Sequence, residues 1–155
     1  MDKFEVTKLL YKADIGNTTV SLVKRKLAAS SGLSAGSECA IEKYILKEVD
    51  LSYLENQIYR QQSLLEFKIQ REMNHENIIR CLEYQVTGNM VRAILEAVDT
   101  PEYLQIELDD NMEPISNELM LKTFMSELLE ALHYIHSKDV IHCDIKIENI
   151  LGQTL

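Results

Sequence analysis

A short stretch near the carboxyl end, "IHCDIKIENIL", holds several side chains that could do chemistry. Asp144, Lys146 and Asn149 follow one another at intervals of two and three residues, and His142 precedes the aspartate by two. A carboxylate can accept a proton, an ammonium can stabilise an anionic group, and a carboxamide oxygen can hold a metal ion. One rigid loop could supply all three functions, although a solvated surface turn would also accommodate these residue types.

This spacing resembles the catalytic loop of protein kinases, whose general pattern is H-R-D-x-x-x-x-N. The resemblance implies that Asp144 accepts the proton of a substrate hydroxyl and that Lys146 steadies the transferring phosphoryl group. It also implies that Asn149 holds Mg²⁺. Cys143 stands where the family has an arginine that pairs with a phosphorylated activation loop, so no such switch is expected here.

Two further segments, in the family's order, resemble the kinase small lobe. "YILKEVDL" resembles its third strand and places Lys47 where the family has its nucleotide-phosphate lysine. "EFKIQREMNHENII" resembles helix C and the turn after it, with Glu66 on the helix and Glu76 in place of a proline. The resemblance implies that Glu66 pairs with Lys47 and holds it against the phosphates of ATP. Taken singly, each would be interpreted as a solvated surface residue.

The same resemblance assigns other positions to ATP. "VRAILEAV" resembles the strand that leads into the hinge, with Leu95 as the gatekeeper and the backbone of residues 96–98 facing adenine. In the phosphate-covering loop only Gly16 and Val23 match the pattern G-x-G-x-x-G-x-V, so a loose closure over phosphate is expected. The predicted ATP-binding residues are Ile15, Gly16, Val23, Ile45, Lys47, Glu66, Leu95, Glu96 and Val98.

Hydrophobic spacing predicts the elements that position these residues. Helical stripes predict one helix between residues 52 and 74 and a second from about 118 to 136, with Ser116 as a helix cap. Strands are predicted in "TTVSLVKRK" and "EKYILKEVDL", and a hairpin over residues 78–98 turns at 87–89. The small, polar "AASSGLSAGSE" predicts a loop. The apolar stripe of the first helix comprises Leu54, Ile58, Leu65, Ile69 and Met73, and that of the second includes Leu121, Phe124, Leu128, Leu132 and Ile135.

The fold class is therefore predicted as α+β, with an antiparallel sheet carrying one helix and then a helical segment. The resemblance implies a kinase-like small lobe, of sheet plus helix C, with only the first part of the helical large lobe. It places the small lobe and hinge at about residues 1–98 and the start of the large lobe at 99–155, so the whole chain is interpreted as a partial kinase domain.

Composition narrows the cellular setting. The 155 residues show no secretory signal, no apolar run long enough to span a membrane, and three cysteines without metal-ligand spacing. A reducing, cytoplasmic location is expected. The net charge of −9 comes largely from residues 93–121, which hold eight acidic and no basic side chains. This argues against nucleic acid as a partner and leaves either a solvated face or a rim for basic peptides. No membrane partner is expected, because no apolar run is long enough.

Two functions remain open. Lys146 resembles the serine/threonine branch, and "YILKEVDLS" is most similar to NIMA-related kinases. No D-F-G triplet for magnesium follows Asp144, so the chain is expected to be an incomplete kinase that binds ATP weakly and transfers little phosphate. The alternative is a pseudokinase-like fragment that docks a protein partner. The apolar stripe of residues 118–136 is expected to favour self-association or a partner.

Overall fold

The computed structural model describes residues 3–13, 17–26, 42–98, 102–103 and 118–152. The described residues group into two compact units, one drawn from 1–73 and 80–97 and the other from 74–79 and 98–155. No helix within those described ranges is long and apolar enough to cross a membrane.

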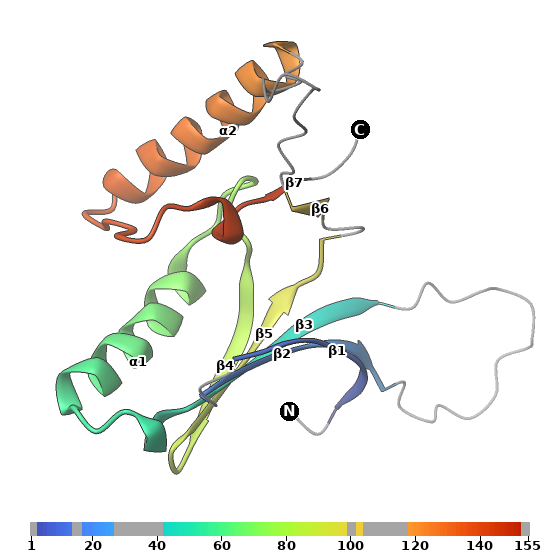
Figure 1. The fold of residues 1–155 in the computed structure, drawn as a ribbon, viewed down its shortest axis with the longest axis vertical. Helices are drawn as coiled ribbons and strands as arrows, with labels where there is room; N and C mark the ends of the chain where they lie inside the picture. The colour runs from blue at the N-terminus through green and yellow to red at the C-terminus, as the bar shows by residue number, and fades with distance from the viewer. Residues whose placement is uncertain (1–2, 14–16, 27–41, 99–101, 104–117, 153–155) are drawn as a thin grey trace, which may run out of the picture. The chain divides into compact units, whose positions relative to one another are not determined.

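The first unit is built on a five-stranded antiparallel sheet in the order β1-β2-β3-β5-β4 (Figure 1). The strands are β1 (Phe4–Lys12), β2 (Thr18–Arg25), β3 (Lys43–Asp50), β4 (Cys81–Thr87) and β5 (Met90–Glu96). The predicted strands in β2 and β3 are confirmed, as is the hairpin of β4 and β5. Gly88 turns that hairpin at a φ of +58°, a backbone conformation that glycine adopts without strain.

Strand β1 was not predicted from the sequence. Its segment "FEVTKLLYK" carries a glutamate and two lysines, and its register with β2 is interrupted twice. These features suit an edge strand, because one side of it pairs with no neighbour and both its charges and its irregularities can face water. The predicted loop at 28–38 lies outside the described residues.

Helix α1 (Gln57–Glu72) begins later than the predicted start at residue 52. Asp50 accepts a hydrogen bond from the backbone N–H of Ser52 at 2.9 Å and caps the short 3₁₀ turn η1 (Leu51–Tyr53). Asn56 accepts one from Ile58 N at 2.8 Å and caps α1 itself. Two local caps therefore divide a segment whose hydrophobic spacing looked continuous.

The predicted apolar stripe of α1 is confirmed only in part, because of its five members only Met73 is buried. Ile58 and Leu65 are 61% and 51% exposed, whereas Phe67 is completely buried. The ring of Phe67 stacks on Tyr84 of β4 with centroids 6.4 Å apart. In Figure 1, α1 runs alongside β4. One aromatic side chain therefore contributes more to the packing of this helix than the more numerous aliphatic residues on its other face.

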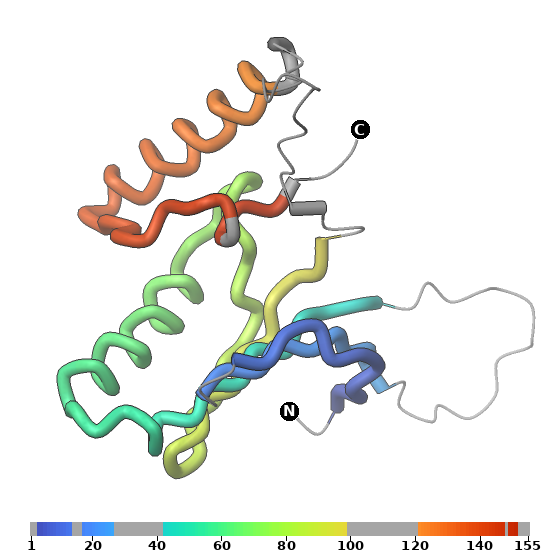
Figure 2. Tube along the Cα trace, in the orientation of Figure 1, coloured from blue at the N-terminus to red at the C-terminus, as the bar shows by residue number. Residues whose placement is uncertain are grey.

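The second unit contains helix α2 (Glu118–His136), and its bounds agree with the prediction. It also contains strands β6 (Glu102–Tyr103) and β7 (Leu151–Gly152), which pair antiparallel, and the 3₁₀ turn η2 (Ile147–Asn149). The helix and the chain that follows it are traced in orange and red in Figure 2. Ile135 is buried, while Leu121 and Leu129 are 50% and 57% exposed. Ser116, the predicted cap, lies outside the described residues.

Replacing Phe67 by alanine should destabilise the first unit by about 3–5 kcal/mol, because its ring is fully buried against the sheet. Leu65→Ala on the exposed side of the same helix is the matched control and should cost under about 1 kcal/mol. Urea unfolding of the whole chain, followed by circular dichroism, measures both. Equal losses would mean that α1 packs through the face predicted from its aliphatic spacing.

Candidate functional site

An ion pair joins the central strand of the first unit to its helix. Lys47 on β3 lies with its Nζ atom 2.6 Å from Oε1 of Glu66 on α1. The same ammonium lies 5.3 Å from the ring centroid of Phe67, which is buried one residue further along the helix. The predicted pairing of Lys47 with Glu66 is therefore present. The Glu66 side chain is 54% exposed, so the pair serves to orient the lysine more than to stabilise the fold.

The strand register shows which residues share the face of Lys47. Ile45 lies opposite Leu22 on β2 and Leu95 on β5, and Lys47 lies opposite Val20 and Ala93. Because side chains alternate along a strand, all six side chains point to one face of the sheet. Ile45 and Leu95, both predicted to contact ATP, are therefore neighbours on the face that carries Lys47.

Val23 does not belong to this group. It lies opposite Tyr44, which in turn lies opposite Glu96, so these side chains occupy the other face of the sheet. The alignment of Val23 with the last residue of the glycine-loop pattern is therefore wrong by one residue, because a shift of one residue moves a side chain to the other face of a strand. The β2 residues that share the face of Lys47 are Val20 and Leu22, which the pairing of β2 with β3 identifies. Ile15 and Gly16 lie outside the described residues.

The remaining predicted hinge residues follow β5. Glu96 is the last residue of that strand and is half-buried, and its carboxylate binds the backbone of Arg80. Val98 is half-buried and belongs to the second unit. No pattern in the sequence predicted the role of the Glu96 carboxylate, because it binds a backbone group.

The second unit brings the two predicted catalytic residues, Asp144 and Lys146, together with the predicted metal ligand Asn149. Lys146 Nζ lies 3.1 Å from Oδ2 of Asp144. Asn149 donates from Nδ2 to the same Oδ2 at 2.9 Å and to the backbone carbonyl of Asp144 at 2.8 Å. The hydrogen bond from Lys146, and then that from Asn149, hold the pKa of the exposed Asp144 carboxyl below its usual value. All three side chains are exposed.

Backbone geometry sets the direction of this loop. Cys143 has a φ of 64°, which is uncommon for a residue with a side chain. His142 stabilises the reversal, because its Nδ1 atom accepts the backbone N–H of Asp144 at 3.2 Å. The turn η2 then returns Asn149 to the aspartate. The histidine at this position therefore has a local structural role, which spacing alone did not reveal.

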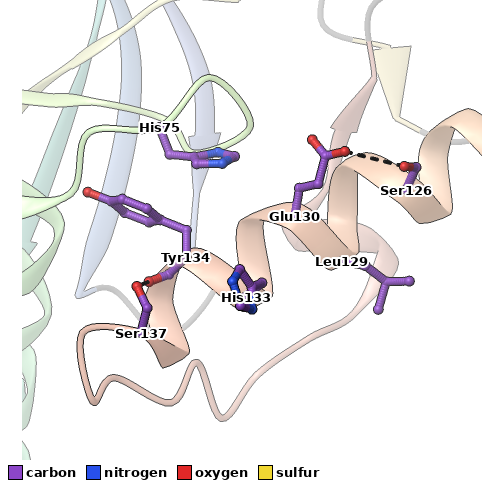
Figure 3. Close-up of a pocket in the computed structure, with 7 residues that line it drawn as sticks. All are labelled: His75, Ser126, Leu129, Glu130, His133, Tyr134 and Ser137. Carbon is purple, nitrogen blue, oxygen red and sulfur yellow. Dashed lines mark hydrogen bonds between the residues drawn. The ribbon is translucent and has the colours of Figure 1, made fainter.

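Helix α2 also carries an open pocket of about 470 Å³ (Figure 3). The rings of His75 and Tyr134 lie 5.0 Å apart, and the hydroxyl of Tyr134 accepts the backbone N–H of Asn74 at 3.0 Å. Asn77 Nδ2 donates to the carbonyl of Glu127 at 3.1 Å. These bonds fasten residues 74–77 to α2. The pocket is lined by His75, Ser126, Leu129, Glu130, His133, Tyr134 and Ser137, none of which was predicted as a site residue.

Comparison with known proteins decides the family. The family model described as "Protein kinase domain" matches residues 29–154. This chain belongs to the protein kinase family. It is 30% identical to Aurora kinase B-A of Xenopus laevis over 154 residues, which cover 97% of the chain and 37% of that protein. It is 30% identical over 152 residues to Aurora/IPL1-related protein kinase 2 of Caenorhabditis briggsae, with 97% and 44% covered.

A third relative, mitogen-activated protein kinase 13 of Mus musculus, is 29% identical over 147 residues, which cover 90% of the chain and 40% of that protein. The kinase chain thus spans less than half the length of these relatives. Their names do not support the predicted resemblance to NIMA-related kinases. The sheet with helix α1 is a kinase small lobe, and α2 with the loop after it belongs to the large lobe.

The Asp144 carboxyl should become less acidic when its cation is removed, although the hydrogen bond from Asn149 remains. In Lys146→Met the pKa of Asp144 should rise, because the largest cause of its depression is the hydrogen bond from Lys146. The variant carboxyl will then become protonated at a higher pH than the native one as pH falls. Carboxyl ¹³C shifts followed through a pH titration measure the pKa of Asp144 in the native chain and in the variant. Lys138→Met, whose ammonium lies over the Tyr134 ring, is the control and should leave Asp144 unchanged.

Proposed function

We propose that the chain supplies the nucleotide-holding lysine and the hydroxyl-orienting loop of an ATP-dependent serine/threonine protein kinase. The observation that carries this proposal is the contact of 2.6 Å between Lys47 and Glu66. A lysine fixed on a central strand by a helix glutamate is the arrangement that positions phosphates in protein kinases. The serine/threonine branch is supported by Lys146 and by the Aurora names of similar proteins.

Lys47 would bind a phosphate oxygen of ATP through its ammonium, while Glu66 and the Phe67 ring hold the side chain in place. Ile45 and Leu95 lie on the same face of the sheet and are partly or fully buried. They would give the adenine ring an apolar surface to pack on. The base and the phosphates would therefore lie along one face of β3.

Asp144 would orient the substrate hydroxyl and accept its proton. Both side-chain bonds to this carboxylate, from Lys146 and Asn149, go to Oδ2. Oδ1 therefore remains as the acceptor for a serine or threonine hydroxyl. The depressed pKa keeps the group ionised, and the Lys146 ammonium lies close enough to stabilise charge on the transferring phosphoryl group.

Magnesium would supply charge neutralisation on the phosphates when bound. In the loop after α2, the Oδ1 atom of Asn149 and the Asp144 carboxylate are oxygen donors of the type that Mg²⁺ prefers. Among the described residues, no group of three or more His, Cys, Asp and Glu side chains is placed to hold a metal. We therefore expect ATP binding to be weak and only partly dependent on magnesium.

The proposed protein substrate would carry basic residues near its hydroxyl. The second unit has three lysines, Lys122, Lys138 and Lys146, and no arginine, and residues 93–121 hold eight acidic side chains. A cationic peptide would be attracted to such a surface. Most of that acidic segment lies outside the described residues, so this assignment rests on the sequence. The proposed location is the cytoplasm.

A second candidate function is partner binding without phosphate transfer. In the alignment to the phosphate-loop pattern, Thr18 and Ser21 take the places of two glycines, and Cys143 replaces the arginine before the catalytic aspartate. These substitutions weaken features that the catalytic family uses. The exposed Leu121 and Leu129 of α2 offer an apolar surface for a partner or a second copy.

ATP should raise the melting temperature of the chain, and Lys47→Met should weaken its affinity on the order of tenfold or more, because the phosphate loses its ammonium partner. Lys43→Met, an exposed lysine on the same strand, is the matched control and should bind ATP like the native chain. A thermal-shift titration with and without Mg²⁺ measures all three. Unchanged affinity in Lys47→Met, or a tight site that requires magnesium, would contradict the proposed site.

Any phosphate transfer by the chain to a basic substrate protein should fall by about 10²–10⁴-fold in Asp144→Asn, because the proton acceptor is lost. Asp139→Asn removes another exposed carboxylate from the same unit and should leave the rate unchanged. Incorporation of ³²P gives the rates. A native chain that binds ATP but transfers none would favour the second candidate function, and equal rates for native and Asp144→Asn would exclude the proposed role of Asp144.

A further inference from the structure

Strand β1 forms one edge of the five-stranded sheet and exposes many apolar side chains (Figure 1). In the order of the described strands its outer side has no neighbour, so alternate backbone N–H and C=O groups along it face outward. Four large apolar side chains, Val6, Leu9, Leu10 and Tyr11, are between 45% and 57% exposed. At the opposite edge, among the described residues, β4 exposes only Val86. The edge at β1 therefore has the most apolar surface to bury against a partner strand.

Two opposite charges on β1 lie on the same face of the sheet. Glu5 lies opposite Lys24 of β2, and Lys8 lies opposite Leu22. Residues 22 and 24 share a face because side chains alternate along a strand, so Glu5 and Lys8 share that face as well. On a regular strand, residues three apart would point to opposite faces. The register shift between Val6 and Lys8 removes that difference.

Both charges are accessible to a partner. The Glu5 side chain is 55% exposed, although its Oε2 atom lies 3.4 Å from the ammonium of Lys24. Lys8 is exposed, and no ion pair between described residues includes it. Opposite charges that face each other across two paired strands stabilise the pairing. Each of these groups can therefore meet an opposite charge on a strand added at the edge.

The sequence of β1 is complementary to itself in an antiparallel arrangement. Around a twofold axis perpendicular to the sheet, Glu5 of one copy can face Lys8 of a second copy, and Lys8 of the first can face Glu5 of the second. The same register places Phe4 opposite Leu9. Phe4 and Leu9 lie opposite odd-numbered residues of β2, on the face away from Glu5. Residues opposed in this register therefore lie on matching faces of the sheet.

The register shift also favours a second copy over an unrelated strand. An extra residue in an edge strand puts the side chains that follow it on the wrong face for a regular partner. A second copy has the same extra residue, Thr7, directly beside the twofold axis, so the faces match on both sides of the axis. The hydroxyl of Thr7 donates to the carbonyl of Leu22 at 3.0 Å, which holds this residue on its own sheet.

We propose that β1 is a dimerisation edge, through which two copies of the chain pair antiparallel and form one continuous sheet. The contacts between Glu5 and Lys8 fix the register, and the apolar side chains beside them become partly covered. The interface consists of one strand from each copy and is small, so the dimer dissociates on dilution. It does not involve the apolar surface of α2.

Sedimentation velocity of the intact chain, over about a hundredfold range of concentration, measures the dissociation constant of the dimer. Lys8→Glu should raise this constant by about tenfold or more, because two attractive contacts between the copies become repulsive. Glu5→Lys should do the same. An equimolar mixture of the two variants should restore native affinity, since the lysines at positions 5 and 8 of one copy then meet glutamates of the other.

The matched control is Lys12→Glu, which changes the net charge equally on the same strand but lies outside the paired residues 4–9. It should dimerise like the native chain. A native chain that is monomeric at every concentration would overturn the proposal, and so would a mixture of the two charge variants that stays monomeric. A dimer that survives Lys8→Glu but is lost in Leu129→Glu would assign self-association to α2 and would also overturn it.

Amide hydrogen exchange of the native chain gives a second measurement that needs no variant. Protection of the amides in residues 4–9 should be higher in concentrated than in dilute solution, because outward-facing N–H groups of β1 become bonded in the dimer. Protection of Ala93, on the interior strand β5, should stay constant. Equal protection of residues 4–9 at both concentrations would exclude pairing through β1.

Discussion

The packing of Phe67 between α1 and the sheet is the contact on which the first group of site residues depends. Glu66 can reach Lys47 only while the neighbouring Phe67 holds the helix against β4. The ion pair itself is too exposed to supply that attachment. The apolar contact therefore supplies stability, and the charged contact that it positions supplies chemistry. A variant with a loosened helix would lose the orientation of Lys47 before losing the sheet.

The geometry of the loop after α2 does not depend on apolar packing of its functional side chains. Its three functional side chains are exposed, so their mutual hydrogen bonds and the local turn must set their geometry. The left-handed conformation of Cys143 is stabilised in part by the His142 ring. Such a loop is rigid because its polar groups satisfy one another.

The sequence predicted most of the fold because β2, β3, the β4–β5 hairpin and α2 have clear periodicities and end signals. It did not predict β1, whose charges are tolerated only because the strand lies at an edge. It also selected the aliphatic face of α1, since a lone aromatic residue has no period to detect. The site prediction depended on finding Lys47, Glu66 and Asp144 in the order that the family has. Val23 was misplaced because a shift of one residue changes the face of a strand.

The ion pair between Lys47 and Glu66 also limits how a phosphate can approach. An ammonium has three N–H directions. Glu66 accepts one of them, and the centroid of the Phe67 ring lies 5.3 Å from the nitrogen. Glu66 needs only one N–H of the ammonium, so N–H groups remain for an incoming anion. The helix can then keep its hold on the lysine while the ligand is bound. Nucleotide exchange would therefore require no rupture of the strand-to-helix link.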